Sequence, residues 1–289
     1  MTPFQQYFRY IVAAAFIGRE TGDEYPGYTF YSYCEKFHMK FIKEILGVHC
    51  KASNVACRAE LGRLPLWAKI SFSCIKFLEH LLTSENTLVF KNFQATKNFN
   101  PWAKKLYSIF NSLGFSYIAE SNCSIKALLP NIKQRLIDQC TQEQSSKIYS
   151  STKLKFYQHF YDFNCRSAYV DILRNKTERS ILCKIRLSAH NLAIERGRHL
   201  GLHTSDRICT ICKTGDVEDE SHFLFKCEKY SNYRRSFQCN ILSILQKNHL
   251  SENQMLKFCM NSNSLKVLRV TCSYINNCLT LRNEIIQYS

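Results

Sequence analysis

The sequence predicts a mainly α-helical protein, built from bundle-like helical segments with a small cysteine- and histidine-containing module near the C-terminus. Three observations support this fold class. Apolar residues recur at helical spacing in several segments, glycine or proline bounds most of those segments, and few stretches alternate as strands do. Apolar residues also make up 45% of the 289 residues and aromatic residues 13%, which is enough for a packed core.

The N-terminal part of the chain changes from irregular to helical near residue 35. Residues 1–34 mix glycine, proline and charge without a sustained period, so they predict an irregular leader. Residues 35–46 place phenylalanine and isoleucine side chains on one helical face, and Gly47 can end that helix. Ser53 is suited to cap a second, short helix, and Pro65 to open a third, so a compact helical unit is predicted.

Further helices are predicted in the middle of the chain. Asn100 and Pro101 supply a cap and a first-turn proline for one helix. Residues 124–150 have a helical pattern in which Pro130 marks a start or a kink. Residues 155–165 are densely aromatic; we predict that they pack in the core, although such side chains can also stack on nucleic-acid bases.

Two more helices are predicted towards the C-terminus, at residues 236–247 and 264–286, the second with an apolar stripe. These patterns divide the chain into three parts. We expect a leader at 1–34, a helical domain at 35–150 and a helical C-terminal domain at 151–289.

Four residues near the C-terminus are spaced like a complete set of zinc ligands: Cys209, Cys212, His222 and Cys227, written Cys-x2-Cys-x9-His-x4-Cys. A two-residue gap lets one tight turn aim two thiolates at one ion, and Zn²⁺ takes four sulfur or imidazole ligands in a tetrahedron. A glycine-containing turn between the two pairs can return the chain. The set predicts a zinc-stabilised CCHC module at residues 207–235. Its zinc would be structural, because four protein ligands leave no open position for a substrate.

Other interpretations of these residues remain open. The chain has 15 cysteines, so Cys209 and Cys212 could be a redox pair or plain buried thiols. His199 and His203 also lie near the cysteines in sequence, but His222 is the preferred ligand because it lies between the two thiolate turns. A fourth histidine nearby, His190, is interpreted as a structural side chain.

The acidic run that precedes His222, Glu218 to Glu220, predicts a structural role. Acidic side chains at a helix start offset the positive end of the helix dipole, and Asp219 or Ser221 can cap the exposed N–H groups. The alternative is a carboxylate that accepts a hydrogen bond from the ligand imidazole.

The chain is strongly basic, since 39 Lys and Arg against 23 Asp and Glu give a formal net charge of +16. This charge favours polyanionic partners such as RNA or DNA, with a merely basic surface as the alternative. The apolar run at residues 10–17 is far shorter than the ~20 residues that span a bilayer, so no membrane partner is predicted. The odd cysteine number and the lack of a secretion signal favour an intracellular location, in the cytoplasm or nucleus.

Basic residues on both sides of the cysteine cluster are candidate nucleic-acid contacts, because guanidinium groups suit phosphate oxygens. The candidates are Lys184, Arg186, Arg196, Arg198, Arg207, Arg234 and Arg235. The alternative is a solvated helix face on which Arg186 or Arg198 pairs with Glu195.

Three sequence words occur together and in order: "ELGRLPL", "RLSAHNLAIERGR", and "CTIC" followed by "EDESHFLFKC". Residues 35–66 resemble the thumb-proximal segment that follows the polymerase core in reverse transcriptases of animal non-LTR, LINE-like retrotransposons. Residues 179–234 resemble the C-terminal cysteine-histidine region of the same polyproteins. The resemblance extends from Glu35 nearly to the C-terminal end.

The resemblance implies a nucleic-acid-binding part of a transposable element whose full-length protein is an RNA-directed DNA polymerase. Polymerases of this family hold Mg²⁺ with palm aspartates, two of them in a Tyr-x-Asp-Asp hairpin, whereas this sequence contains no Asp-Asp dipeptide. The segment most similar to Tyr-x-Asp-Asp is "YVDI" at Tyr169 to Ile172, which carries one carboxylate in a helix-like context. We therefore expect a remnant without catalytic residues that holds RNA or DNA through phosphates, with a palm-containing polymerase segment as a further partner.

Three other functions are consistent with the sequence. The chain could be a protein-interaction scaffold, a decayed transposon copy without function, or an accessory part of an active polymerase whose palm is supplied separately. Residues 1–34 depart from the resemblance, so we expect an unrelated leader there, such as that of a misjoined gene model.

Overall fold

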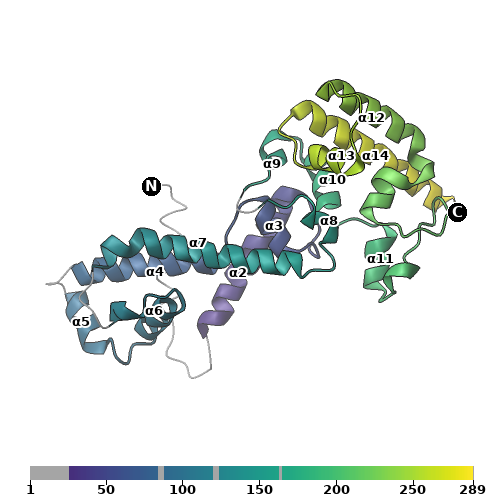
Figure 1. Ribbon diagram of the computed structural model, residues 1–289. Coiled ribbons are helices and arrows are strands. Elements are labelled where there is room, and N and C mark those ends of the chain that lie inside the picture. Colours follow the sequence, from purple (N-terminus) through teal and green to yellow (C-terminus); the bar gives the residue numbers. More distant parts are fainter. Residues whose placement is uncertain (1–25, 84–87, 120–123, 163–164, 289) are drawn as a thin grey trace. The chain divides into compact units, whose positions relative to one another are not determined.

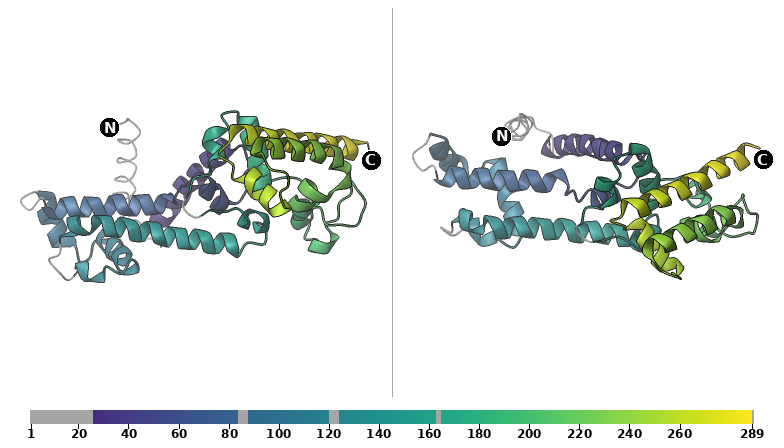
Figure 2. Two further views of the ribbon diagram at one scale, coloured as in Figure 1. Left: turned by 45° about the horizontal axis from the view of Figure 1, so that its top comes forward. Right: turned by 90° about the horizontal axis from the view of Figure 1, so that it is seen from above.

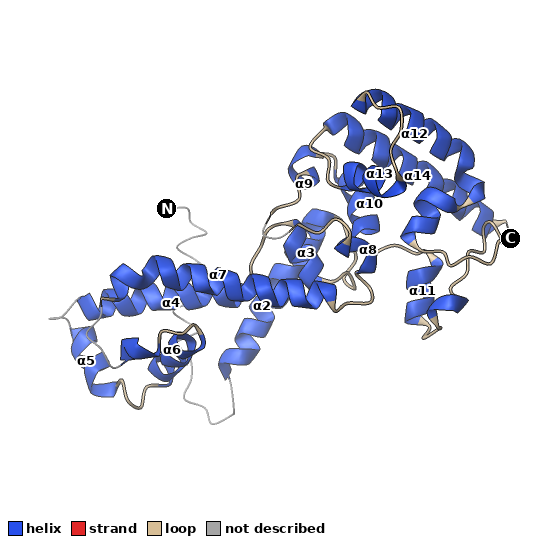
Figure 3. Cartoon of the chain, viewed as in Figure 1, coloured by secondary structure: helices blue, strands red, loops and turns tan. Residues whose placement is uncertain are grey.

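The computed structural model describes residues 26–83, 88–119, 124–162 and 165–288, and in these residues the prediction of a mainly α-helical fold is confirmed (Figures 1 and 3). Helices account for 71% of the described residues, which form no strand beyond one isolated antiparallel bridge between Ile208 and Val217. In the part of the chain that is described, no helix is long and apolar enough to cross a bilayer.

Most of the described residues lie in α-helices. In chain order they are α2 (Pro26–Leu46), α3 (Asn54–Glu60), α4 (Leu66–Thr83), α5 (Leu88–Thr96), α6 (Pro101–Ser112), α7 (Ile125–Tyr149), α8 (Lys155–Gln158), α9 (Tyr169–Ile172), α10 (Lys176–Arg186), α11 (Ala193–His199), α12 (Ser231–Leu245), α13 (Glu252–Met260) and α14 (Leu265–Gln287). Short 3-10 turns lie at Ser116–Ala119, Thr204–Asp206 and Glu228–Tyr230, and a π-helical turn lies at His222–Lys226.

Several predicted helix ends are observed with their expected chemistry. The Ser53 hydroxyl accepts a hydrogen bond from the Ala56 N–H at the start of α3, and Asn100 Oδ1 accepts one from Trp102 N–H at the start of α6. Gly47, which follows α2, has a φ of +67°, the left-handed conformation that a side chain disfavours.

Two local predictions need correction or completion. Helix α2 begins at Pro26, so the irregular leader predicted for 1–34 is wrong over residues 26–34, where proline at the first helical position favours a helix. Residues 1–25 of that prediction lie outside the described part of the chain. Pro130 is the sixth residue of α7, where the missing N–H removes only one helical hydrogen bond.

The chain divides into two compact units: Met1–His38 with Leu64–Glu143, and Met39–Arg63 with Gln144–Ser289. This division differs from the predicted domains, because residues 39–63 group with the C-terminal unit. In the first unit, α4, α6 and α7 enclose a core with fully buried Ile75, Phe110 and Ile132.

The second unit is centred on α10, α12 and α14, and Figure 2 shows α12 and α14 side by side in both views. Phe237 of α12 stacks on Tyr274 of α14 with ring centroids 4.3 Å apart. The described part of the aromatic segment packs as predicted, since Phe156 and Tyr157 are buried in the same core.

Residues 39–63 join this unit through a buried ion pair. The Arg186 guanidinium on α10 donates to both carboxylate oxygens of Glu60, at 2.8 Å from Nη2 and 3.1 Å from Nε. Arg186 is 2% exposed and Glu60 is 0% exposed, and the guanidinium also lies against the rings of Phe160 and Tyr169. A buried charge of this kind requires its partner, so the pair specifies which segments pack together.

Cysteine reactivity should follow burial in this fold. Burial raises the pKa of Cys57 and Cys74 to about 12, so few of these thiols ionise at neutral pH. We expect N-ethylmaleimide at pH 7 to label exposed Cys50 and Cys239 at least tenfold faster than buried Cys57 and Cys74. Peptide mass spectrometry measures the labelling rates. Equal labelling of buried and exposed thiols in the folded protein would contradict this arrangement.

Candidate metal centre

The four predicted ligands come together at one point. One candidate ligand atom from each of Cys209, Cys212, His222 and Cys227 lies within 4.8 Å of all the others, and Cys212 Sγ is 3.4 Å from His222 Nε2. A tetrahedral zinc ion with Zn–S bonds of ~2.3 Å would hold its sulfurs about 3.8 Å apart, so the donor set and its size both fit the metal. Among the described residues, neither His199 nor His203 belongs to such a group.

A short hairpin presents the first two ligands. Cys209 N–H donates to Asp216 O at 2.8 Å, which closes the loop next to the Ile208–Val217 bridge. Lys213 and Gly215 in this loop have φ values of 59° and 85°, and the left-handed conformation at these residues turns the chain back sharply. The turn predicted from the glycine therefore forms, and it leaves both thiols on one side.

A π-helical turn presents the other two ligands. Cys227 N–H donates to His222 O at 2.8 Å, a bond between residues five positions apart, so the ligands occupy the two ends of a single wide turn. Asp219 Oδ1 accepts from His222 N–H at 2.7 Å, which is the capping role predicted for this carboxylate. The four-residue gap between His222 and Cys227 thus corresponds to the π turn.

A hydrogen bond couples the thiols of Cys209 and Cys227. The hydrogen bond from Cys227 to Cys209, together with backbone N–H groups of Cys212 and Ile211, outweighs burial and lowers the pKa of Cys209. The same hydrogen bond raises the pKa of Cys227. A lowered pKa at Cys209 favours the thiolate, which is the form that binds a metal.

The ligand histidine has one nitrogen in the cluster and one beside a carboxylate. Nδ1 of His222 is buried without a hydrogen-bond partner, and Asp216 Oδ2 lies 3.8 Å away. Asp216 is positioned in turn by Thr214, whose hydroxyl donates to Oδ2 at 2.9 Å. A small movement of Asp216 would give the carboxylate–imidazole contact that commonly orients a metal-bound histidine.

Buried carboxylates on the acidic run connect the cluster to the core. Glu218 accepts from Arg282 of α14 at 2.6 and 2.8 Å, and from Ala193 N–H at the start of α11 at 2.6 Å. Glu218 and Arg282 are only 1% and 3% exposed. This pairing was missed at the sequence level, where the acidic run predicts only helix-end roles.

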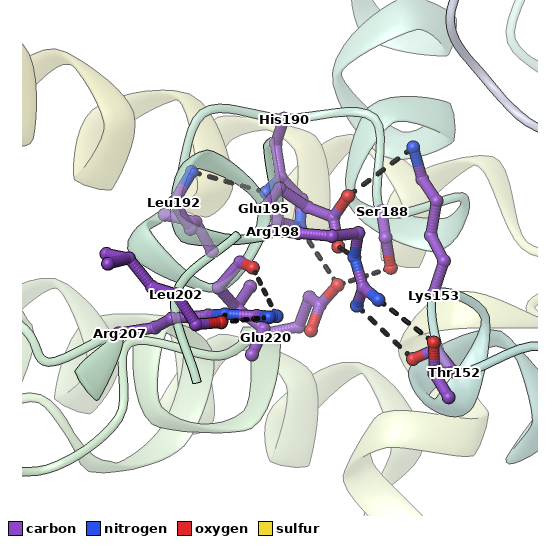
Figure 4. A network of polar contacts seen from close by, with 11 residues as sticks. Thr152, Lys153, Ser188, His190, Leu192, Glu195, Arg198, Leu202, Arg207 and Glu220 are labelled. Carbon is purple, nitrogen blue, oxygen red and sulfur yellow. Dashed lines mark hydrogen bonds and ion pairs between the residues drawn. The ribbon is translucent and has the colours of Figure 1, made fainter. Parts of the chain in front are cut away.

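Glu220 makes the second connection (Figure 4). Its Oε1 accepts from the Ser188 hydroxyl at 2.5 Å and lies 2.9 Å from His190 Nε2, while Leu192 N–H donates to His190 Nδ1 at 3.3 Å. His190 is thus satisfied by the protein, as the interpretation of a structural histidine predicts. Both carboxylates hold the hairpin and the π turn against α10, α11 and α14.

The predicted phosphate contacts fall into two groups. In the first group, the guanidinium already donates hydrogen bonds to acceptors within the protein. Arg186 is buried in its ion pair with Glu60, so its prediction as a nucleic-acid contact is wrong. Arg207 donates to the carbonyl oxygens of Leu202 (2.7 Å) and Ile194 (3.1 Å), and Arg234 to those of Leu224 (3.1 Å) and Cys227 (2.5 Å). Arg198 donates to Glu195 at 2.9 Å, which is the pairing weighed as the alternative (Figure 4).

The second group is accessible. Arg196 on α11 and Arg235 on α12 are exposed, and Lys184 on α10 is half-buried. Tyr230, by contrast, is 1% exposed and packs edge-on against Phe223 beside the ligands. The spacing of the basic residues does not separate these groups, because it gives neither the exposure of a side chain nor the acceptor that it contacts.

No protein-family model, curated protein or solved structure matches this chain.

Proposed function

We propose that this chain is a zinc-stabilised nucleic-acid-binding protein that corresponds to the C-terminal part of a non-LTR retrotransposon reverse transcriptase. The observation that carries the proposal is the convergence of Cys209, Cys212, His222 and Cys227 within 4.8 Å, in the same segment that resembles the cysteine-histidine region of those proteins. Three sulfurs and one imidazole form a donor set that zinc prefers, and all four tetrahedral positions come from protein.

The role proposed for the metal is structural. A zinc ion held by four protein ligands has no open position for water or substrate, so it would join the hairpin to the π turn and take no part in a reaction. Polymerase chemistry is assigned to other parts of such a polyprotein, because this sequence lacks the Asp-Asp pair that would hold Mg²⁺.

Nucleic-acid binding is supported by charge. The net charge of +16 creates a field that attracts polyanions, and exposed Arg196 and Arg235 supply guanidinium groups that suit phosphate. The corresponding binding mode depends on phosphates and has little sequence preference.

A salt series tests this function. With zinc-loaded protein and a fluorescein-labelled single-stranded RNA of mixed sequence, we expect the association constant to fall by at least 100-fold between 50 and 200 mM KCl. That fall corresponds to about five phosphate contacts, at roughly 0.7 released counterions per contact. A scrambled RNA should bind with the same affinity. Absence of binding, or a constant affinity across the salt series, would exclude the proposed function and favour a protein-interaction scaffold.

A further inference from the structure

Basic side chains from four segments of the second unit gather around His49. They are Lys43 on α2, Lys153 before α8, Lys184 on α10 and His199 at the end of α11. Burial is the largest cause that lowers the pKa of His49, and the positive charges of these four neighbours lower it further. Each of these four side chains therefore lies within electrostatic reach of His49.

The loop that carries His49 is held against α10. Ser180 Oγ donates to Gly47 O at 2.6 Å, and Arg179 Nε donates to Ile45 O at 2.9 Å. A side chain at Gly47 would meet Ser180 Cβ at 2.7 Å, so glycine permits this close approach. Lys184 follows Ser180 by one helical turn and lies on the same face of α10, which places it next to the loop.

The histidine and the first lysine are fixed by backbone contacts. Lys43 Nζ donates to Cys50 O at 2.5 Å, across the loop. Lys51 N–H donates to His49 Nδ1 at 3.0 Å, so in the neutral ring the proton resides on Nε2, where it can be donated to an anion.

The other side of the group is built by α11. Arg198 donates to Glu195 (2.9 Å) and to Thr152 Oγ1 (3.0 Å), and Lys153 Nζ lies 3.4 Å from Glu195 (Figure 4). Two cations therefore share one carboxylate. In the described part of the chain, no carboxylate lies within 4.0 Å of Lys43, Lys184 or His199.

We propose that Lys43, His49, Lys153, Lys184 and His199, here called the His49 cluster, bind a phosphate group of a nucleic-acid backbone. The proposal rests on the proposed function and identifies where the phosphate contact is made. An anion bound beside His49 would offset the positive charge of its four basic neighbours, and lysine and imidazole N–H groups are good phosphate donors. A polyanion fits better than a single phosphorylated residue, because a long backbone also gains from the charge spread along the rest of the chain.

Two double variants test the location. Lys153→Gln with Lys184→Gln removes two charges from the cluster, and Arg198 still pairs with Glu195. Lys257→Gln with Lys266→Gln removes two charges from exposed positions on α13 and α14 and is the matched control. We expect the first variant to bind single-stranded RNA about tenfold more weakly near 100 mM KCl, with a salt slope smaller by about 1.4, and the control to change affinity less than twofold. Lys184→Arg, which keeps the charge, should bind nearly as the parent protein does.

Inorganic phosphate provides an independent measurement. Titration of the folded protein with phosphate should shift the imidazole NMR resonances of His49 and His199 but not that of exposed His249. Unshifted His49 and His199 resonances, or equal loss of RNA binding in the two double variants, would overturn the cluster while leaving nucleic-acid binding intact. Phosphate shifts without any RNA binding by the parent protein would overturn both the nucleic-acid ligand and the proposed function. Phosphate shifts with selective loss of RNA binding support the proposal.

Discussion

Replacement of Cys209 by serine is expected to abolish metal binding and to unfold the segment between the hairpin and the π turn. A hydroxyl is a poor zinc ligand, and the remaining three ligands would leave the site open to water and chelators. Structural zinc contributes apparent binding free energies of roughly 10–16 kcal/mol in small zinc modules, so its loss outweighs the few hydrogen bonds that otherwise close this segment. Cys227→Ser should have the same effect through the π turn.

The measurement is zinc content of protein purified from zinc-supplemented medium, combined with amide hydrogen exchange. The parent protein should contain one zinc per chain, and both variants close to none. Exchange should accelerate at least 100-fold in residues 207–230 and much less in α4 and α6. Cys239→Ser is the matched control, since this cysteine is exposed on α12, and it should leave both quantities unchanged. Unaltered zinc content in Cys209→Ser and Cys227→Ser would disprove the ligand set.

The ligand spacing was readable from sequence because all four residues lie within one short segment. The hairpin needs only a glycine and another residue in the left-handed conformation after its two cysteines, where the chain turns back. Helix caps such as Ser53 and Asn100 depend on equally local sequence. The π turn was not predicted, because five-residue hydrogen bonding has no sequence signature comparable to helical periodicity.

Long-range pairings were beyond this kind of prediction. Glu218 and Arg282 are 64 residues apart, and Glu60 and Arg186 are 126 apart. An arginine that contacts phosphate and an arginine that is buried against a distant glutamate look alike in one sequence. Arg186 was therefore predicted as a nucleic-acid contact, although it is buried. Only burial and an identified partner separate the two cases.

Arg186→Met should be the most destabilising single change in the second unit outside the metal ligands. It removes a guanidinium that satisfies Glu60, Ser167, Asn261 and the carbonyl oxygen of Met260, and it leaves the Glu60 carboxylate fully buried without a counter-charge. Breaking a buried ion pair from one side costs about 3–5 kcal/mol, a large part of the 5–15 kcal/mol that stabilises a typical domain. Arg269→Met is the matched control. Its partner Glu178 is 3.7 Å away and the arginine side chain is 61% exposed, so we expect a cost below about 1 kcal/mol.

Hydrogen exchange of α10 and α14 measures this cost in the relevant unit, because both tryptophans, Trp67 and Trp102, lie in the other unit and do not report on it. The double variant Arg186→Met with Glu60→Gln should recover part of the lost stability, since a neutral amide is easier to bury than an unpaired carboxylate. The difference in stability between the single and double variants then measures the free-energy cost of the unpaired Glu60 charge, separately from the packing of Arg186 on its aromatic neighbours. Equal exchange in Arg186→Met and Arg269→Met would show that the Glu60–Arg186 pair does not hold residues 39–63 in this unit.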